Sequence, residues 1–464
     1  MKMFACTFIA SAFAALFLTP IVARIALKLG IVDRPGARRI HPRPIPRMGG
    51  VAILLAMFGP IIPVMLLSNA VGSAFREMQT RVIAMLAASV AMVLVGLVDD
   101  VRGLRARFKF LAQIAAAAVL CAFGIRIETV SVEGLFALHF GWLAWPITIL
   151  WIVSITNAVN LIDGLDGLAA GIAAVACGVI AILAISAGQT VMAVLMLALL
   201  GSLMGFVVFN FNPARIFMGD CGSMFVGFVL ATASVMCNVK SQALVGLALP
   251  ALALGVPIFD TLFSMLRRIL ERRSLFSPDR GHIHHRLLAL GLRHRHVVLI
   301  MYGLTVLAAG LGMFMMATRS AETLLILAGI LLLLALVFRC VGSVRLRESI
   351  AAFKRNLSIA QETKEHKEAF EEAALRIREA RSLDAWWNAL CVAAEEMDFV
   401  CVSLTLDGSD GTVGSLAWRH PSLNGTPDEI IRIAIPTRSL REGVQGRVEL
   451  DVWVNGSLES AGRR

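Results

Sequence analysis

The chain has 464 residues, of which 58% are hydrophobic and only 16% are charged, and its mean hydropathy is +0.78. Soluble domains carry about 25% charged residues, so this composition excludes an ordinary soluble globular protein and indicates a membrane protein. The net charge of +11 is concentrated in a few loops, which makes its placement more informative than its total.

Apolar runs long enough to form membrane-spanning helices recur along residues 1–340. A helix needs about 20 apolar residues to cross the roughly 30 Å of hydrocarbon in a bilayer. We therefore predict an all-α polytopic membrane protein with about eleven transmembrane helices. We expect the first run to be retained, because it is of full spanning length. The expected spans lie near residues 3–23, 50–68, 80–98, 109–124, 144–161, 168–187, 190–209, 223–239, 243–263, 297–317 and 322–338.

Lysine and arginine gather in three groups of connecting segments. If the spans alternate in direction, all three groups fall on one side of the membrane. The positive-inside rule makes that side cytoplasmic, which places the N-terminus outside and the C-terminus inside. The groups are Arg24, Lys28, Arg34, Arg38, Arg39, Arg43 and Arg47; then Arg102, Arg105, Arg107 and Lys109; then the basic residues from Arg267 to Arg295.

The composition changes abruptly after Cys340. Residues 341–382 are charged with helical periodicity, and the next segment predicts a further helix capped by Ser382 or Asp384. Four alternating segments then predict strands: FVCVSLTLDG, GSLAWRHP, EIIRIAIPTR and GRVELDVWVNG. We therefore expect a transmembrane domain over 1–340, and over 341–464 a helical linker with a small cytoplasmic α+β domain of open role.

Two acidic residues, Asp99 and Asp100, stand at the end of the third expected span. Adjacent carboxylates repel each other and raise each other's pKa unless a cation lies nearby. They could be a solvated helix end. The basic residues that follow, ending in Lys109, instead suggest an anionic ligand held beside a metal or a general base.

The segment NAVNLIDGLDGLAAG, residues 157–171, carries four amide and carboxylate side chains, spaced three residues apart, directly after an apolar run. Polar side chains at membrane depth are costly and are functional candidates by default. A simple membrane exit would need one of them, not four. Glycines in the same segment permit a positive φ and the close approach of a ligand. The four side chains are Asn157, Asn160, Asp163 and Asp166.

Two further polar clusters follow. Asp220 lies in RIFMGDCGSMFVGF just before a helix whose N-terminus would favour anions, although Asp220 or Ser223 could be only a cap. The segment SPDRGHIHHRLL carries three histidines and an arginine close together, and three interpretations remain open for it. Phosphate is favoured over zinc, because no cysteine lies near, and a solvated loop is the third. These side chains are His282, His284, His285 and Arg286.

These ingredients together indicate phosphoryl transfer between one substrate in lipid and one in water. Hard oxygen ligands suit Mg²⁺, which takes a few protein oxygens plus substrate phosphates. An ion-coupled transporter is the alternative, although transporter sites lie near the bilayer midplane on broken helices. A membrane-anchored sensor that uses the tail would leave the loop motifs unexplained.

Five ordered motifs resemble the polyprenyl-phosphate N-acetylhexosamine-1-phosphate transferase family, whose relatives include phospho-MurNAc-pentapeptide translocase. They are GIVDRPGARRIHPRPIPRMGG, GLVDD, NAVNLIDGLDGLAAG, RIFMGDCGSMFVGF and SPDRGHIHHRLL. The resemblance implies that a lipid phosphate attacks the β-phosphorus of a UDP-N-acetylhexosamine and releases UMP. GlcNAc is the expected sugar, and the product would initiate a lipid-linked envelope polysaccharide such as O-antigen. It implies a bacterial inner-membrane protein whose active site faces the cytoplasm.

The resemblance also implies roles for single residues. Asn160 and Asp220 would hold Mg²⁺, with Mn²⁺ as the alternative ion. The expected catalytic carboxylates are Asp99, Asp100 and Asp163, the first two orienting or deprotonating the lipid phosphate. Uracil contacts fall on Gly164, Asp166 and Phe217, and contacts to phosphate and sugar on Lys109, His282, His284, His285 and Arg286. The expected partners are the UDP-sugar, undecaprenyl phosphate, the bilayer and a second copy in a homodimer, with no nucleic acid.

Overall fold

The computed structural model describes most of the chain. The described residues are 2–34, 43–132, 135–237, 243–270, 282–318, 321–341, 358, 364, 367–368, 370–397, 399–408, 411–421, 430–438 and 445–453. Of the expected basic groups, Arg38, Arg39 and residues 271–281 lie outside them. The chain divides into two compact units, Met1–Ile350 and Ala351–Arg464, which we describe separately.

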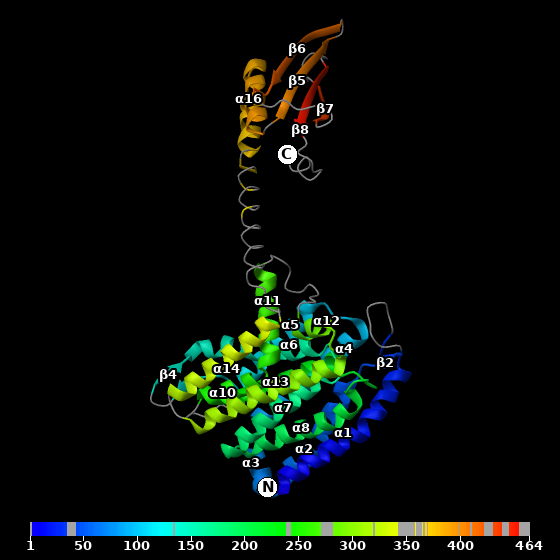
Figure 1. Cartoon of the computed structure of the whole chain (residues 1–464), viewed down its shortest axis with the longest axis vertical. Helices are drawn as coiled ribbons and strands as arrows, with labels where there is room; N and C mark the ends of the chain where they lie inside the picture. The colour runs from blue at the N-terminus through cyan, green and yellow to red at the C-terminus, as the bar shows by residue number, and fades with distance from the viewer. Residues whose placement is uncertain are drawn as a thin grey trace. The chain divides into compact units, whose positions relative to one another are not determined.

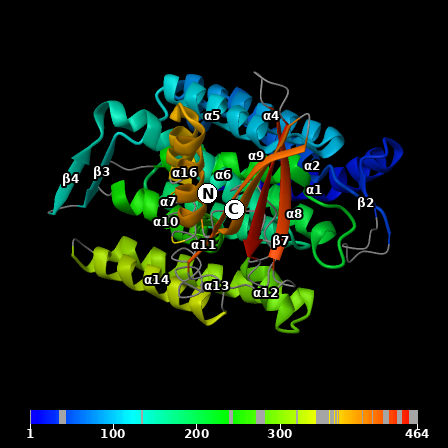
Figure 2. The ribbon, with the colours of Figure 1, turned by 90° about the horizontal axis from the view of Figure 1, so that it is seen from above.

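The first unit is a bundle of long helices (Figure 1). Figure 2 shows α4 and α5 along one side of the bundle and α13 and α14 along the other, with α6, α7 and α9 between them. Its helices are α1 Lys2–Lys28, α2 Gly49–Leu66, α3 Ala70–Glu77, α4 Gln79–Arg102, α5 Ala106–Ala122, α6 Ala144–Ile162, α7 Leu168–Ser186, α8 Thr190–Asn210, α9 Gly219–Met236, α10 Ala243–Ala253, α11 Gly255–Leu270, α12 Ile283–Ala289, α13 His294–Phe314 and α14 Ala321–Cys340.

Short elements connect these helices. Strands β1 (Val32–Asp33) and β2 (Ile45–Pro46) pair in an antiparallel ladder before α2. Strands β3 (Thr129–Val132) and β4 (Phe136–His139) form an antiparallel hairpin between α5 and α6. Single 3₁₀ turns, η1 (Gly141–Leu143) and η2 (Met315–Ala317), precede α6 and follow α13.

Within the described residues, nine helices are long and apolar enough to cross a membrane, and α10 with α11 makes a tenth if the bent pair is one span. The protein is therefore a multi-pass membrane protein. Helix α5 matches the remaining expected span, and with 17 residues it is shorter than the nine helices counted above. The total of eleven spans and their orientation stay predictions.

The expected span over 243–263 is present as two helices, α10 and α11, separated by a break. The two halves are bent by 77°. Pro257 lies in the first turn of α11 and has no N–H to donate to the carbonyl of residue 253, with which its ring would also clash. Pro257 therefore explains the break at Leu254, after which the axis of α11 runs in a different direction from that of α10.

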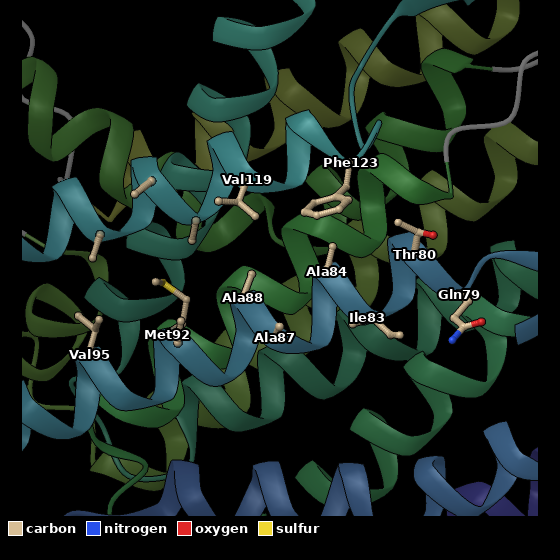
Figure 3. A pocket seen from close by; sticks show the side chains of 14 residues that line it. Gln79, Thr80, Ile83, Ala84, Ala87, Ala88, Met92, Val95, Val119 and Phe123 are labelled. Atoms are coloured by element: carbon tan, nitrogen blue, oxygen red, sulfur yellow. The ribbon is translucent and has the colours of Figure 1, made fainter. Parts of the chain in front are cut away.

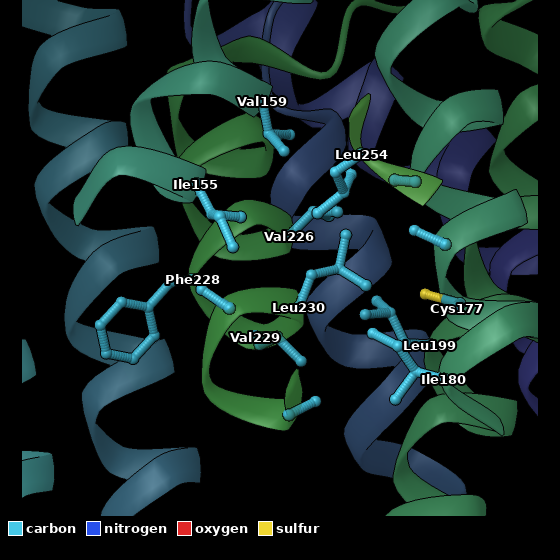
Figure 4. Packing of buried hydrophobic residues seen from close by; sticks show 14 of the residues in the cluster. Ile155, Val159, Cys177, Ile180, Leu199, Val226, Phe228, Val229, Leu230 and Leu254 are labelled. Atoms are coloured by element: carbon cyan, nitrogen blue, oxygen red, sulfur yellow. The ribbon is translucent and has the colours of Figure 1, made fainter. Parts of the chain in front are cut away.

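Helix α9 is the centre of the bundle, since 89% of it is buried. It contacts α2, α4, α6, α7, α8 and α10. Phe228, Val229 and Leu230 of α9 belong to the same buried hydrophobic cluster as Ile155 of α6 and Ile180 of α7 (Figure 4). Small residues elsewhere along α9 let its neighbours approach closely, as is usual between membrane helices. A helix enclosed on all sides can hold the side chains at its end in fixed positions.

The second unit contains helix α16, Leu383–Glu396, and one antiparallel sheet in the order β6-β5-β8-β7. Ser382 accepts a hydrogen bond of 3.1 Å from the backbone N of Ala385, which confirms it as the expected helix cap. The helix packs on the sheet through a core that includes Ala394, Val402 and Val448. All four expected strands are present, as β5 Phe399–Gly408, β6 Gly411–Arg419, β7 Ile430–Arg438 and β8 Gln445–Trp453.

Candidate active site

Asp100 caps the start of the central helix α9. Its two carboxylate oxygens accept hydrogen bonds from the backbone N–H groups of Asp220, at 3.0 Å, and Cys221, at 3.1 Å. The side chain of Asp100 is fully buried, with the guanidinium of Arg47 3.8 Å away. A carboxylate is favourable there, because the first N–H groups of a helix are unpaired and carry partial positive charge. Asp100 therefore fixes the backbone that carries Asp220.

Three glycines make this contact possible by letting backbones touch. A Cβ at Gly50 in α2 would lie 2.2 Å from the backbone N of Gly222, and one at Gly96 in α4 would lie 2.4 Å from the Cα of Cys221. Gly219 has φ +73, and a Cβ there would lie 2.6 Å from Oδ2 of Asp100. The glycines of the motifs PRMGG, GLVDD and MGDCG are thus required by the close approach of α2 and α4 to α9.

The neighbouring Asp99 points the other way, toward α5, because successive helix residues are rotated by about 100°. Its Oδ2 accepts a hydrogen bond of 2.7 Å from Lys109 Nζ, and its Oδ1 accepts one of 2.6 Å from the backbone N of Leu104. Lys109 Nζ also lies 3.4 Å from Oδ2 of Asp220. Lys109, expected at a phosphate, therefore bridges two carboxylates in this structure and links α4, α5 and α9.

Asn160 meets the first turn of α9 from the end of α6. Its Oδ1 accepts a hydrogen bond of 2.6 Å from Ser223 Oγ. Because Ser223 follows Asp220 by three residues, the two project from the same side of α9. The amide oxygen of Asn160 and the carboxylate of Asp220 are thus brought to one helix end.

This donor set fits a Mg²⁺ ion that shares its coordination with a substrate. Among the described residues, no group of three His, Cys, Asp or Glu side chains could enclose a metal. Mg²⁺ usually takes one or two protein oxygens and fills its remaining positions with phosphate oxygens and waters. Here the two protein oxygens would come from Asn160 and from the partly exposed carboxylate of Asp220. Asn160 and Asp220 are the residues that would hold it.

Asp163 and Asp166 shape the turn between α6 and α7. Asp163 is half-buried, and burial raises its pKa well above the usual range, aided by repulsion from Asp220 and Asp100. Oδ2 of Asp166 accepts hydrogen bonds from Asn212 Nδ2, at 2.9 Å, and from the backbone N of Ala214, at 3.1 Å. The expected uracil contact Asp166 therefore holds the loop before α9.

The histidine motif reaches the same turn. A Cβ at Gly164 would lie 3.1 Å from Nε2 of His284, so the imidazole lies directly against Gly164. His284 is 1% exposed, and its Nδ1 is buried without a hydrogen-bond partner among the described residues. Its ring stacks on that of His282 and lies 4.4 Å from the ring of His285. Burial and the neighbouring histidines lower the pKa of His284 to about 3.

This pKa changes the expected role of His284. A neutral imidazole offers one donor and one acceptor, so His284 can orient a ligand but cannot neutralise a phosphate at pH 7. His285 is exposed beside it, and Arg286 is half-buried. Phe217 is half-buried too, and its backbone bonds to Pro46 and Gly49 fix the segment that leads into α9.

Sequence reasoning missed Asp260 of α11, which anchors the histidine motif. Its carboxylate lies 3.0 Å from Nδ1 of His282 and accepts a hydrogen bond of 2.9 Å from the backbone N of Ile283. Asp260 is 5% exposed. The signal was present, since an aspartate in the apolar stretch GVPIFDTLF is costly unless it is paired. Gln113, which accepts a hydrogen bond from Asn157, was also missed, and the contacts of Arg47 with Asp100 and of Ser223 with Asn160 were not expected.

Comparisons with known proteins identify the family of this chain. Residues 82–238 match the model of glycosyl transferase family 4, a range that includes the Asp99–Asp100 pair, Asn160 and Asp220. "Probable undecaprenyl-phosphate N-acetylglucosaminyl 1-phosphate transferase" of Bacillus subtilis (strain 168) is 38% identical over 296 residues, which cover 64% of this chain and 80% of that protein. The chain belongs to the polyprenyl-phosphate N-acetylhexosamine-1-phosphate transferase family.

Two other relatives are named for decaprenyl phosphate and for undecaprenyl phosphate. "Decaprenyl-phosphate N-acetylglucosaminephosphotransferase" of Mycobacterium tuberculosis (strain ATCC 25618 / H37Rv) is 35% identical over 353 residues, covering 70% of this chain and 86% of its own. "Undecaprenyl-phosphate alpha-N-acetylglucosaminyl 1-phosphate transferase" of Thermotoga maritima is 30% identical over 275 residues, covering 58% and 77%. The relatives' names share the N-acetylglucosamine phosphate group and differ in the length of the polyprenyl chain.

The glycine contacts make a prediction about stability. Gly50→Ala and Gly96→Ala should each lower the melting temperature in detergent, because the new Cβ would overlap the backbone of α9. Overpacking of this kind costs about 1–3 kcal/mol. Gly178→Ala in α7 is the matched control, since a Cβ there meets nothing within 4 Å. Unchanged melting of Gly96→Ala would show that α4 does not pack on α9 as described.

His284 makes a prediction about pH. Its pKa is near 6.5 in the unfolded chain and about 3 when folded, so between these values the unfolded state binds one more proton. Stability should therefore fall as the pH falls below 6.5, by up to about 1.4 kcal/mol per unit. Between pH 6.5 and 5, wild type should lose more thermal stability than His284→Asn. His139→Asn, at an exposed position, should follow wild type; equal losses in all three proteins would contradict the buried neutral state of His284.

Proposed function

We propose that this chain transfers N-acetylglucosamine 1-phosphate from UDP-N-acetylglucosamine to undecaprenyl phosphate and releases UMP. The observation that carries the proposal is the hydrogen bond from Ser223, one turn after Asp220 at the start of α9, to Asn160 at the end of α6, in a member of this family. The product would be the first lipid-linked intermediate of an envelope polysaccharide such as O-antigen. The proposal places the site on the cytoplasmic side of the bacterial inner membrane.

The proposed reaction is an exchange of phosphoanhydride bonds. An oxygen of the lipid phosphate attacks the β-phosphorus of the UDP-sugar and forms a new P–O–P bond. The bond between the β-phosphorus and the oxygen that bridges to the α-phosphorus breaks, and UMP leaves with that oxygen. A lipid phosphate is already largely ionised at pH 7, so the step does not require a protein base.

The lipid phosphate and the diphosphate of the UDP-sugar repel each other, and the proposed site would reduce this repulsion by neutralising their charge. Mg²⁺, held by Asn160 and Asp220, would neutralise the diphosphate when bound. His285 and Arg286, which directly follow His284, would bind phosphate, and neutral His284, which lies against Gly164, would orient the sugar. Asp100 contributes by positioning Asp220, whereas Asp99 holds Lys109. In such sites preorganised charge supplies most of the rate enhancement.

The transporter alternative would need an acid near the middle of the membrane on a broken helix. The broken pair α10–α11 does carry one, Asp260. That carboxylate is already bonded to His282 and to the backbone of Ile283, and it supports the site at the helix ends. The other acids that we discuss lie at helix ends. The geometry therefore favours transferase activity.

The proposed function predicts release of UMP from purified protein with undecaprenyl phosphate, Mg²⁺ and one member of a panel of UDP-sugars. UDP-N-acetylglucosamine should be the productive donor. Asp220→Asn should lower turnover by at least 100-fold, which corresponds to about 2.7 kcal/mol, and should raise the Mg²⁺ concentration needed. Glu128→Gln, at an exposed side chain, should behave as wild type. A folded wild-type protein that releases no UMP with any donor would contradict the proposal.

A further inference from the structure

Tyr302, the one tyrosine of the chain, reaches from α13 to the turn between α6 and α7. Its hydroxyl donates a hydrogen bond to the carbonyl oxygen of Gly167. A Cβ at Gly171 would overlap the phenol ring, so this glycine makes room for the tyrosine beside α7. The ring is half-buried, and a buried phenol usually finds a partner for its O–H. The backbone of the turn is that partner.

Gly167 has a backbone conformation that its neighbours must hold. Its φ is +78, in the left-handed region that favours glycine. Its N–H donates a hydrogen bond of 3.1 Å to Oδ1 of Asn210 in α8. Its carbonyl oxygen accepts one of 3.0 Å from the N–H of Gly171 in α7, and the second from Tyr302. Three helices therefore hold one residue of the turn, and α13 does so through a single hydroxyl.

A second contact from α13 reaches the neighbouring residue of the turn. Nε of Arg295 donates a hydrogen bond of 3.0 Å to the carbonyl oxygen of Asn212. Nδ2 of Asn212 in turn donates to Oδ2 of Asp166, at 2.9 Å. Arg295 precedes Tyr302 by seven residues, which is two helical turns, so both project from the same face of α13. This face holds Gly167 directly and Asp166 through Asn212.

The histidine motif contacts the other end of the same turn. A Cβ at Gly164 would lie 3.1 Å from Nε2 of His284, as described above. His284 belongs to α12, which contacts α13 and precedes it in the chain. The segment from His284 to Tyr302 therefore contacts the turn at both ends, at Gly164 and at Gly167. The position of α13 and the position of the turn depend on each other.

We propose that Tyr302 is a positioning residue for the donor: its hydrogen bond holds the turn in the conformation that binds the uracil of the UDP-sugar. This inference rests on the proposed function, with uracil contacts at Gly164 and Asp166 as the family resemblance implies. Without the hydroxyl the turn would adopt further conformations, and the donor would bind only the fraction in the competent one. Tyr302 would therefore set the affinity for the donor and leave the chemical step unchanged.

The substitution Tyr302→Phe tests this role, because it removes the hydroxyl and keeps the ring beside Gly171. Loss of one hydrogen bond typically changes an equilibrium about fivefold. The Kd for UDP with Mg²⁺, measured by calorimetry without acceptor lipid, and the KM for UDP-N-acetylglucosamine should each rise by about that factor. The kcat and the KM for undecaprenyl phosphate should stay within about twofold of wild type. A general loss of packing would instead lower kcat and weaken both substrates together.

Two variants that remove a hydroxyl elsewhere are the controls. Thr305→Val acts on the same helix, where the buried hydroxyl donates only to the carbonyl of Met301, at 2.8 Å. Thr80→Val acts on α4, where the side chain lines an apolar groove between α4 and α5 (Figure 3). Both should bind UDP as wild type does. A wild-type Kd in Tyr302→Phe, or equal weakening in Thr305→Val, would overturn the proposal.

A spectroscopic measurement on the unsubstituted chain provides a second test. Because Tyr302 is the one tyrosine, growth with fluorotyrosine places a single ¹⁹F probe in the protein. Saturating UDP with Mg²⁺ should shift this ¹⁹F signal, since the probe lies against the turn that binds the nucleotide. Undecaprenyl phosphate alone should leave the signal in place. An unchanged signal with saturating UDP would contradict the contact between donor site and tyrosine.

The two proposals can fail separately. If Tyr302→Phe weakens UDP binding but the wild-type protein releases no UMP with any donor, the proposed reaction is wrong and the positioning role is kept. If the wild-type protein releases UMP normally and Tyr302→Phe binds UDP as wild type does, the positioning role is wrong and the reaction is kept.

Discussion

The buried carboxylate of Asp100 accepts two backbone hydrogen bonds at the start of α9, and the rest of the site depends on this contact. A buried charge is tolerated only when it is paired and hydrogen-bonded, and here the helix end and Arg47 provide both. The contact requires glycine at positions 50 and 96, because any side chain there would separate the backbones. It sets where Asp220 stands, and Asp220 with Asn160 sets where a metal could bind.

The polar side chains around the start of α9 form hydrogen bonds with one another, which replace the hydrogen bonds to water that burial removes. Asp99 pairs with Lys109, Asp260 with His282, and Asn157 with Gln113. The first pair joins α4 to α5, the third joins α6 to α5, and the second joins α11 to the residue that precedes α12, so the pairs also fix the arrangement of these helices. Among the described residues, the buried Nδ1 of His284 has no hydrogen-bond partner, and the side chain of Asp220 is 26% exposed. We propose that these two groups contact the ligand, whereas the paired side chains hold the helices together.

Much of the fold could be predicted because its signals are local. Long apolar runs give the helices, and alternating residues with turn signals give β5 to β8. The break at Leu254 was missed, since a hydropathy window averages over Pro257. Asp260 was also missed. The role of a single aspartate in an apolar helix becomes clear only when its partner is known, and that partner, His282, is 22 residues further along the chain. The pairing of Lys109 with Asp99 and Asp220 is likewise a tertiary fact that no spacing reveals.

The central claim is that the start of α9 and the end of α6 together form the metal and diphosphate site. The most direct test is an experimental structure of the protein in a lipid nanodisc with UDP-N-acetylglucosamine and Mg²⁺. The account predicts one ion about 2.0–2.2 Å from both Asn160 Oδ1 and an Asp220 oxygen, with the diphosphate completing its coordination. Nucleotide bound with its ion at Asp99 and Asp163, or with no contact to Asp220, would contradict it.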